Sequence, residues 1–504
     1  MTTLIPKFEQ AYANAVNRPI NQKLAETISV KDFGAKGDGV TDDTAAFLAA
    51  RDALQTAGYT RGGVIRVPAG QYVLSQEWAF TSDATQLLHN IYIEGDGPDN
   101  TALNFSTAPS GTNGISFNKG AHFGIKGLQI VNAPANGVFI GKGNTGTDYS
   151  LLYRLENIQC QSCGTNGLQG INTYMGTIED SWFRNNTSVG VVYTGFHTSL
   201  SFKRCYALNN SYGYTLNGII YSHFDVCSAD SNTHQGYVCS NLRAVNFTAC
   251  GTENNAADGW EFFTSTASST GIPTQAQDIH GVVLDSCYGL GNSTGSPGSY
   301  ATFVTTATAD NRPINIKIVG GSASPATTSD KCLISAATSG AITLTVDGLY
   351  YDGFTSPDYQ AGAVYKLNQA ITGLQVLAAN NADQSLASGS LTTIALQGIT
   401  YNQLNATIAS NAITIPTGIN RISVTAQILW QANGTGSRYV GILKNGNPVA
   451  TQRVTASTEQ EPQLLTSQVI EVAVGDTISF NAVQTSGSSI NILNGSFVVI
   501  QAIS

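Results

Sequence analysis

The stretch Gly236-Tyr-Val-Cys-Ser-Asn-Leu-Arg-Ala-Val-Asn-Phe-Thr-Ala-Cys-Gly-Thr-Glu-Asn-Asn-Ala-Ala-Asp-Gly259 decides the fold of this chain, because it is one unit of a repeat. Its two end glycines belong to a series spaced 23 residues apart: Gly167, Gly190, Gly213, Gly236 and Gly259. A repeat of this length without a helical pattern of apolar residues is typical of a solenoid of β-strands. We therefore predict stacked coils with a buried stripe and a long ridged surface.

Alignment of the repeat on its glycines places residues of one kind at equal positions in successive coils. Large residues follow the glycines at the first and third positions, as in Tyr237 and Cys239 or Trp260 and Phe262. Alternate positions share one face of a strand, and we expect this face to be interior, although an aromatic stripe for stacking sugars is the alternative. We also expect a buried column of small residues (Cys205, Cys227, Cys250, Cys287) and a hydrogen-bonded ladder at a turn (Asn186, Asn210, Asn232, Asn255, Asn292).

Composition narrows the classes of partner. The 504 residues include 52 glycines, only 11% are charged, and the net charge is −9. This charge argues against binding nucleic acid or an anionic membrane through a general electrostatic field. Neither a secretory signal at residues 1–10 nor an apolar run of about 20 residues is expected from the sequence. The pair Cys160 and Cys163 lacks a second CxxC, and we expect no metal and no cofactor.

Three segments near the start of the repeat region carry a resemblance to a known family. They are Val30-Lys-Asp-Phe-Gly-Ala-Lys-Gly-Asp-Gly39, Thr41-Asp-Asp-Thr44 and Gly62-Gly-Val-Ile-Arg-Val-Pro-Ala-Gly70. This pattern resembles the opening motif of pectate-lyase-like phage tailspikes. The resemblance is close over residues 28–75, and the coils extend it to about residue 370. It implies an all-β protein built on a right-handed parallel β-helix.

A helix is expected directly after the motif. Thr41 is expected to cap this helix, and its apolar stripe is Ala45, Phe47, Leu48 and Leu54. Such a helix covers the open end of a solenoid, where strand edges and apolar core are otherwise exposed. For the aspartates of the motif we expect turn and cap roles rather than metal binding.

The sequence divides into four segments. Residues 1–27 are expected to attach the chain to another virion tail protein, or alternatively to form a flexible leader. Residues 28–120 begin the β-helix with its capping helix, and residues 121–370 form the catalytic β-helix. Residues 371–504 predict an antiparallel β-sandwich or jelly roll with a hairpin turn at Lys444-Asn-Gly-Asn447.

The last segment is similar to tumour-necrosis-factor-like and complement-head jelly rolls. This similarity implies a homotrimer. Glycan binding, with Trp430 and Tyr439 as stacking residues, is the alternative role for this domain.

Paired acids are the leading candidates for catalysis. The resemblance to tailspikes implies cleavage of a bacterial capsular or lipopolysaccharide glycan, by hydrolysis or by β-elimination. Asp230 and Glu253 each follow a column cysteine by three residues, so they occupy equal positions in adjacent coils. Stacked coils are about 4.8 Å apart, which is close to the spacing of about 5 Å in a retaining glycosidase. Like charges at this spacing raise one pKa and create a general acid.

Further candidates lie near this pair. Asp258 and Glu261 flank Gly259, and the long excursion Thr264–Asp278 follows them as the expected wall of a cleft. As substrate-binding residues we expect His234, Arg184, Arg243 and His280. The alternative is that these outward acids are ordinary solvent-exposed surface residues without a catalytic role.

The resulting hypothesis is a trimeric phage tailspike that depolymerises a bacterial surface polysaccharide, most simply as an endo-glycosidase using paired carboxylates. It implies a protein folded in the host cytoplasm, carried on the virion tail and acting at the bacterial surface. A lyase acting on a uronate-containing capsule and a glycan-binding tail fibre without activity remain the alternatives.

Overall fold

The computed structural model describes most of the chain beyond residue 26. The described residues are 7–8, 11, 14–20, 23, 27–56, 62–82, 88–141, 149–264, 278–295, 301–307, 313–326, 331–337, 342–351, 363–367, 375–379, 382–402, 404, 406–416, 419–460 and 462–503. The chain divides into two compact units. The first comprises residues 1–345 and 349–364, and the second residues 346–348 and 365–504.

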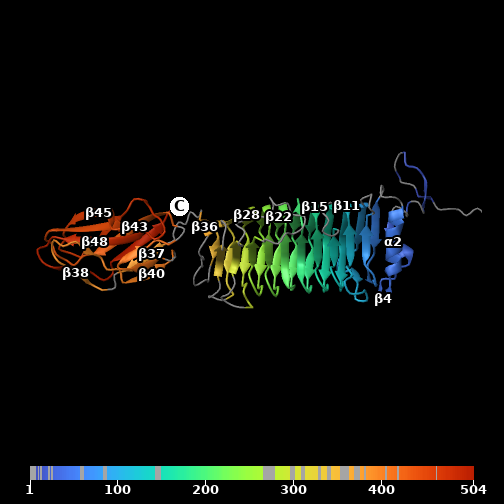
Figure 1. Ribbon diagram of the computed structural model, residues 1–504, viewed down its shortest axis with the longest axis horizontal. Coiled ribbons are helices and arrows are strands. Elements are labelled where there is room, and N and C mark those ends of the chain that lie inside the picture. The colour runs from blue at the N-terminus through green and yellow to red at the C-terminus, as the bar shows by residue number, and fades with distance from the viewer. Residues whose placement is uncertain are drawn as a thin grey trace, which may run out of the picture. The chain divides into compact units, whose positions relative to one another are not determined.

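The first unit is a parallel β-helix whose coils stack side by side (Figure 1). Its first column of strands is one ten-stranded parallel sheet: β7 (Trp78–Thr81), β10 (Ile115–Asn118), β12 (Val138–Ile140), β14 (Leu168–Ile171), β17 (Val189–Thr194), β21 (Tyr212–Asn217), β24 (Tyr237–Ser240), β27 (Trp260–Phe263), β30 (Ala301–Ala307) and β33 (Lys331–Ala337).

Two further columns complete each coil. The second column contains β3 (Ile28–Ser29), β5 (Gly63–Val67), β8 (Leu88–Gly95), β11 (Gly120–Val131), β13 (Ser150–Gln161), β15 (Thr173–Glu179), β18 (His197–Thr198), β19 (Ser201–Lys203), β22 (Ile219–Asp225), β25 (Arg243–Thr248), β28 (Ile279–Asp285), β31 (Ile314–Val319), β34 (Ile342–Asp347) and β36 (Ala363–Leu367). The third contains β4 (Asp38–Asp42), β6 (Gly70–Val73), β9 (Thr101–Asn104), the last residues of the long strands β11 and β13, then β16 (Trp182–Arg184), β20 (Tyr206–Leu208), β23 (Ser228–Asp230), β26 (Gly251–Glu253), β29 (Tyr288–Leu290), β32 (Ser322–Ser324) and β35 (Tyr350–Tyr351). The prediction of a parallel β-helix is confirmed.

The repeated glycines are required by the close approach of neighbouring coils. A Cβ atom on Gly213 would lie 2.4 Å from the carbonyl oxygen of Gly236, and one on Gly236 would lie 2.8 Å from that of Gly259. Real Cβ atoms do not come this close to backbone, so a side chain at these positions would push the coils apart. The 23-residue series is therefore a packing requirement of the stack.

The aromatic residues that follow these glycines lie inside the β-helix, as predicted. The ring centroids of Tyr214 and Tyr237 are 4.5 Å apart, and those of Tyr237 and Trp260 are 4.0 Å apart. Phe202 and Phe224 stack opposite them at 4.6 Å. These side chains are fully buried, so the alternative of a sugar-binding stripe on them is wrong.

The expected cysteine and asparagine columns are also confirmed. All eight cysteines are free and buried. The Asn210 side chain donates to Asn232 Oδ1 at 3.3 Å, and the Asn232 side chain donates to Asn255 Oδ1 at 2.8 Å. After Asn186, whose Oδ1 accepts from Cys163 N at 3.0 Å, each asparagine Oδ1 also accepts from the backbone N–H of the asparagine in the preceding coil, as Asn232 does from Asn210 at 2.9 Å. The ladder therefore satisfies buried backbone groups at the turn between the third and first columns.

A helix covers the end of the stack that holds the first strands (Figure 1). It is α2 (Thr44–Thr56), preceded by the 3-10 turn η1 (Val30–Phe33), and Phe47 and Ala50 bury its inner face. The prediction of a Thr41 cap is wrong. Thr41 lies in β4, where its hydroxyl donates to Asp38 Oδ2 at 2.7 Å, and the Asp43 carbonyl oxygen accepts the first helical hydrogen bond, from Phe47 N.

The second unit is an antiparallel β-sandwich. One sheet has the order β40 (Gly398–Asn402), β37 (Gln375–Ala379), β50 (Phe497–Ala502), β43 (Arg421–Leu429), β46 (Pro462–Thr466), with β47 (Ile470–Glu471) on β43. The other has the order β41 (Thr407–Ala409), β42 (Ala412–Thr414), β48 (Thr477–Gln484), β44 (Ser437–Lys444), β45 (Asn447–Thr455), with β39 (Thr392–Thr393) on β48. Alternate residues of both sheets form one apolar core. The expected turn at residues 444–447 joins β44 to β45, with positive φ at Asn445 and Gly446.

Short strands complete the described elements. β38 (Gln384–Leu386) pairs with β49 (Ile490–Ile492) in the second unit, and β1 (Lys7–Phe8) pairs with β2 (Arg18–Pro19) near the start of the chain.

Candidate functional site

The candidate site lies on the outer face of the third column, over β16, β20, β23, β26 and β29. These three-residue strands pair in parallel and in register. The middle residue of each strand points into the core, as Phe183, Ala207 and Ala229 do. Since side chains alternate along a strand, the first and third residues form two parallel rows on the outer face.

The first row, here called the aromatic row, is Trp182, Tyr206, Ser228, Gly251 and Tyr288. The side chain of Trp182 is 41% exposed, and its ring centroid is 5.0 Å from that of Tyr206. The small residues Ser228 and Gly251 interrupt the row before Tyr288. A Cβ added to Gly251 would meet its nearest atom, Ser228 Oγ, at 3.6 Å, an ordinary van der Waals contact. The row therefore has two small residues between two tyrosines.

The second row, here called the acidic row, is Arg184, Leu208, Asp230, Glu253 and Leu290. Asp230 and Glu253 are direct neighbours across the pairing of β23 with β26. Parallel strands are about 4.8 Å apart, and this distance separates the two backbone positions. The two carboxyl groups thus lie side by side, next to the two small residues of the aromatic row.

Asp230 is held by hydroxyl groups from the aromatic row. The Tyr206 hydroxyl donates to Asp230 Oδ2, and the Ser228 hydroxyl donates to Oδ1 at 2.8 Å. Only 4% of Asp230 is exposed, and this burial raises its pKa while both hydroxyl donors oppose the rise. The pKa of Tyr206 is raised as well, chiefly by burial and then by its hydrogen bond to Asp230.

Glu253 is more exposed than Asp230 and has fewer stabilising donors. Its pKa is raised by burial and by the neighbouring charge of Asp230. The pKa of Tyr288 is raised as well, by burial and by the charges of Glu253 and Asp230. Two coupled carboxyl groups with unlike surroundings are a typical arrangement for a proton donor next to an ionised partner.

Arg184 lies on the same face, two coils before Asp230 in the acidic row. Its Nε donates to Gln161 Oε1 at 3.0 Å, a terminal nitrogen donates to Gln159 Oε1 at 3.2 Å, and its guanidinium lies 5.8 Å from the Trp182 ring centroid. These contacts hold the cation beside an exposed aromatic ring.

Asp258 and Glu261 are not brought to this pair. Asp258 is buried next to the first column. Glu261 lies on β27, on the first column rather than the third, where Gln235 Nε2 donates to Glu261 Oε2 at 3.0 Å and burial raises the pKa of the carboxyl group. The expected wall of the cleft, residues 265–277, lies outside the described residues.

The other expected substrate-binding residues are distributed over different faces. His234 follows β23 in a turn, where Ser211 Oγ lies 3.0 Å from its Nδ1 and its ring stacks on Tyr212. Arg243 and His280 are neighbours on the second column. Arg243 donates to both carboxylate oxygens of Asp278, at 2.8 and 2.9 Å, so its charge is paired within the protein.

Trp182, Tyr206, Ser228 and Tyr288 are the site residues that sequence reasoning missed. Each directly follows a member of the cysteine column or its equivalent, Ser181, and precedes the acidic row by two residues. A search for aromatic residues outside the positions that follow the glycines would have found this pattern. The aromatic residues were expected mainly in the interior, so this outward row was not predicted.

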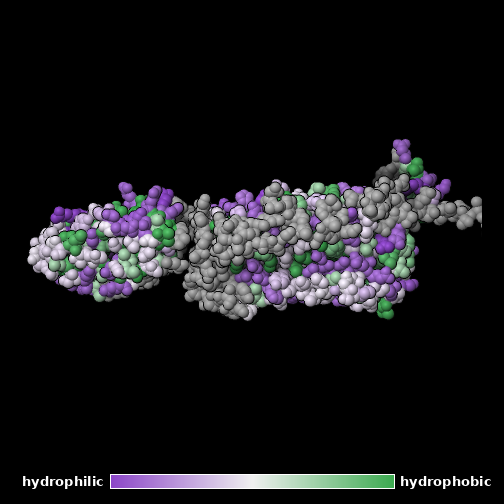
Figure 2. Space-filling view, viewed as in Figure 1, coloured by the Kyte–Doolittle hydropathy of each residue, from purple (hydrophilic) through white to green (hydrophobic). Residues whose placement is uncertain are grey.

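The described residues hold no group of three or more His, Cys, Asp or Glu side chains arranged to bind a metal ion. Within the same residues, no helix has the length and apolar character needed to cross a membrane. The site therefore consists of carboxyl, hydroxyl, guanidinium and aromatic groups. Figure 2 shows hydrophilic residues with scattered hydrophobic ones over the coloured part of the coils.

This stack of parallel coils defines the first unit as a parallel β-helix. Residues 27–271 match the family described as "Rhamnogalacturonase A/epimerase, pectate lyase-like". The prediction of a pectate-lyase-like β-helix is thus confirmed for this part of the chain. It contains the acids Asp230 and Glu253 and the two hydroxyl donors Tyr206 and Ser228.

Curated relatives match short parts of the chain. Mannuronan C5-epimerase AlgE3 of Azotobacter vinelandii is 45% identical over 75 residues, 15% of this chain and 4% of its own length. Alginate lyase 7 of the same organism is 31% identical over 199 residues, 36% of this chain and 22% of its own. The preneck appendage protein of Bacillus phage PZA is 27% identical over 157 residues, 31% and 16% respectively. The chain thus spans less than a quarter of each of these relatives.

Solved structures resemble the chain at low sequence identity. Full-length tailspike protein 2 of Escherichia coli O157:H7 bacteriophage CAB120 aligns over 99% of this chain and 76% of its own, with 11% identity and a TM-score of 0.49. The A-module of mannuronan C-5 epimerase AlgE4 of Azotobacter vinelandii aligns over 69% of this chain and 100% of its own, with 16% identity and a TM-score of 0.43.

Proposed function

We propose that this protein is a phage tailspike that binds a bacterial surface polysaccharide on the third column and hydrolyses it with Asp230 and Glu253. The observation that carries the proposal is the pair itself: two adjacent carboxyl groups with raised pKa values beside two small residues flanked by tyrosines. Aromatic side chains stack on the apolar faces of sugar rings, so a glycan bound along this row places a sugar ring next to the acids.

The unlike surroundings of the two acids assign them different roles. Glu253 is the general acid, because burial and the charge of Asp230 raise its pKa and favour the protonated form. Asp230 is the ionised partner, because the hydroxyls of Tyr206 and Ser228 both donate to its carboxylate. Glu253 protonates the glycosidic oxygen while an Asp230 oxygen attacks the anomeric carbon. Water, deprotonated by Glu253, then hydrolyses the glycosyl–Asp230 ester, which retains the configuration of the sugar.

The two rows suggest the path of the glycan. Trp182 and Tyr206 lie on one side of Ser228 and Gly251 along the row and Tyr288 on the other, so a chain running across the coils contacts aromatic rings before and after the acids. Arg184 lies beside Trp182 and offers hydrogen bonds to sugar hydroxyl or carboxylate groups.

The proposal includes the wider setting of a tailspike. Residues 1–27 attach the chain to another tail protein, and residues 371–504 support a homotrimer or bind glycan. The resemblance of residues 28–75 to tailspikes and the similarity to an appendage protein of a Bacillus phage support a place on the virion. Folding in the host cytoplasm and action at the bacterial surface follow from that place.

A lyase is the second candidate, favoured by the names of the relatives. An alginate lyase and mannuronan epimerases are enzymes named for uronate polymers. In a β-elimination, Arg184 would neutralise the uronate carboxylate and an acidic-row group would take the neighbouring proton. Against this, the raised pKa of Tyr206 keeps this phenol protonated, and it donates its proton to Asp230, so it is not available to take a proton from the sugar.

Incubation of the purified full chain with capsules and O-antigens from a panel of strains tests the proposal. New reducing ends without an unsaturated uronate chromophore are expected, and they should vanish in Glu253→Gln and Asp230→Asn. The matched control Asp285→Asn, an exposed acid on the neighbouring column, should cut normally. Appearance of the chromophore would establish the lyase, while glycan binding without any cleavage would establish a tail fibre. Full activity of Glu253→Gln would refute the acid pair.

A further inference from the structure

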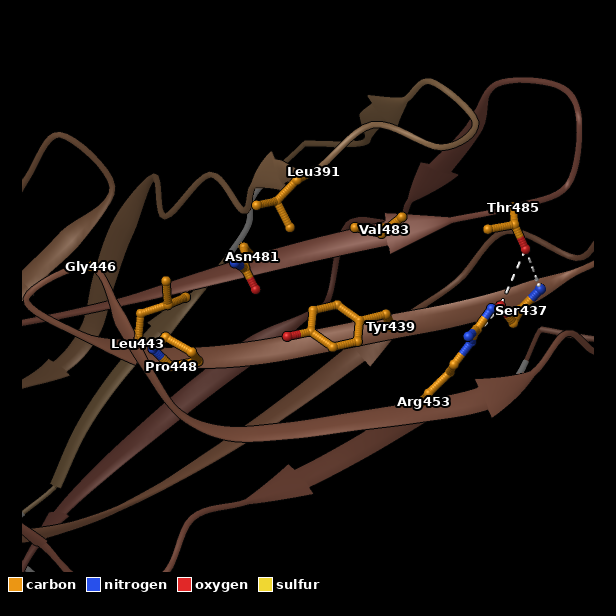
Figure 3. Close-up of a pocket in the computed structure, with 10 residues that line it drawn as sticks. All are labelled: Leu391, Ser437, Tyr439, Leu443, Gly446, Pro448, Arg453, Asn481, Val483 and Thr485. Carbon is orange, nitrogen blue, oxygen red and sulfur yellow. Dashed lines mark hydrogen bonds between the residues drawn. The ribbon is translucent and has the colours of Figure 1, made fainter.

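A second site is formed on the outer face of one sheet of the β-sandwich. It is a pocket of about 530 Å³ lined by β44, β45 and β48 and by residues next to β39. Its ten lining residues are shown in Figure 3: Leu391, Ser437, Tyr439, Leu443, Gly446, Pro448, Arg453, Asn481, Val483 and Thr485. The pocket combines apolar side chains with a guanidinium, an amide and two hydroxyls, the composition of a small-molecule site rather than a protein interface.

Tyr439 forms the floor of this pocket. Its ring lies along β44 between Leu443 and Pro448 at one end and Arg453 at the other (Figure 3). Gly441 makes this position possible, because a Cβ there would lie 2.4 Å from Asn481 Oδ1 and 3.1 Å from the Tyr439 hydroxyl. The absence of a side chain at Gly441 lets the ring lie flat and brings its hydroxyl towards the Asn481 amide.

Asn481 carries an unused hydrogen-bonding group at this point. Its Oδ1 is buried and has no hydrogen-bond partner among the described residues. A buried polar atom without a partner costs about 1–3 kcal/mol, so such an atom in a pocket indicates a partner that arrives with a ligand.

Arg453 is fixed at the opposite end of the ring. Its Nε donates to Ser437 Oγ at 2.9 Å, and Ser437 Oγ lies 3.2 Å from Thr485 Oγ1, which also accepts from Ser437 N at 2.9 Å. These contacts use only Nε. The two terminal nitrogens, which form the fork that binds carboxylates, make no hydrogen bond or ion pair within the described part of the chain.

We propose that this pocket binds a carboxylated sugar residue of the surface polysaccharide. The apolar face of the sugar ring stacks on Tyr439, its carboxylate accepts from the terminal nitrogens of Arg453, and a hydroxyl donates to Asn481 Oδ1. A ring with one apolar face, one carboxylate and several hydroxyls satisfies all three groups together, whereas a neutral sugar leaves the Arg453 fork unused. This site is separate from the acid pair and needs no catalysis.

Residue-resolved modification of arginines by phenylglyoxal, read by mass spectrometry, tests the site in the full chain. The Glu253→Gln variant removes cleavage, so the result does not depend on the proposed enzyme. The probes are methyl β-D-glucuronoside, methyl α-D-galacturonoside and the methyl glycoside of N-acetylneuraminic acid, with methyl β-D-glucoside as the neutral match. We expect at least one acidic probe to slow modification of Arg453 about tenfold, as expected for a charge-assisted pair, and the glucoside to leave it unchanged.

Two variants decide whether the pocket is responsible. Tyr439→Ala should abolish the protection of Arg453 while the protein keeps its thermal unfolding midpoint. Lys444→Gln, which removes a positive charge from the end of β44 outside the pocket, should keep it. The proposal is overturned if none of the acidic probes protects Arg453, if the glucoside protects it equally, or if protection survives in Tyr439→Ala. Protection of Arg184 alone would assign the acidic sugar to the β-helix instead.

Discussion

The proton balance of Asp230 depends on one phenol. Burial raises the pKa of this carboxyl group, and the hydrogen bond from Tyr206 lowers it. The proposed role of Asp230 as the anion therefore depends on the hydrogen bond from Tyr206. Glu253, one coil further, accepts from no hydroxyl of this kind among the described residues, and its pKa is raised by burial and by the charge of Asp230. Which of the two carboxyl groups is the proton donor and which is the anion is thus decided by the residue that lies next to each in the aromatic row.

Tyr206→Phe should shift the acid limb of the activity profile to higher pH. Removal of the phenol removes a cause that lowers the pKa of Asp230, so the carboxylate becomes protonated at higher pH than in the wild type. The profile of kcat/KM against pH on the susceptible polysaccharide measures this. Tyr212→Phe, whose ring stacks on His234 away from the acids, is the control and should leave the limb in place. An unchanged limb in Tyr206→Phe would remove this role of the phenol.

Because of the buried His197, we expect the folded protein to lose stability at acidic pH. It is buried inside the β-helix, where its Nδ1 lies 3.0 Å from Thr173 Oγ1, and burial lowers its pKa from 6.5 to about 3. Between these values the unfolded chain binds the proton and the folded chain does not, so stability rises with pH across this window. Urea unfolding at pH 7 and pH 4.5 should show a lower midpoint at the lower pH. His197→Gln should lose part of this pH dependence, and a dependence identical to wild type would contradict the assignment.

At the scale of the element, each coil is positioned by contacts with the next coil rather than by its own sequence alone. The glycines of the 23-residue series face the carbonyl oxygen of the following coil, the asparagine ladder joins successive turns, and the aromatic rings stack along the interior. Because each coil contacts only its neighbours, stability is approximately a sum over such interfaces. The outer rows are the other result of the same register, since they place equal positions side by side.

Gly213→Ala should destabilise the β-helix strongly, by roughly 1–3 kcal/mol as for other overpacked sites. The new methyl group would start 2.4 Å from the carbonyl oxygen of Gly236, and backbone must move to admit it. Gly251→Ala is the matched control, since its Cβ would meet nothing closer than 3.6 Å. Chemical unfolding of both variants measures the difference. Equal midpoints would show that the coils yield at no cost.

At the scale of the whole molecule, two units with different cores carry different parts of the proposal. The β-helix holds the acid pair, and the β-sandwich holds the pocket around Tyr439 and Arg453. A polysaccharide with repeated units offers a ligand to each of these sites, because every repeat carries the same groups.

The proposed homotrimer is testable by mass. Light scattering after size-exclusion chromatography of the full chain should give three times the chain mass of 52.9 kDa. Within this proposal the sandwich supplies the main interface. A chain without residues 371–504 should then lose the trimer. A monomer at micromolar concentration of the full chain would contradict the proposal.

The repeat by itself determined the parallel coils, the buried aromatic and cysteine columns, the asparagine ladder and the adjacency of Asp230 with Glu253. A strict period allows this, since residues of equal phase become neighbours whatever the rest of the chain does. The capping helix was also predictable, whereas its first residue was not, because several Asp and Thr side chains compete to satisfy the same turn.

Only the tertiary structure decided which face each outward side chain joins. Asp258, Glu261, Arg243 and His280 are near the acid pair in sequence, yet the bends between columns direct them into the interior edge, the first column or the second. The same bends bring Tyr206 from the preceding coil onto Asp230. The direction of a side chain depends on which strand of the coil carries it. That strand depends in turn on where single residues with positive φ, such as Arg204 and Val226, turn the chain.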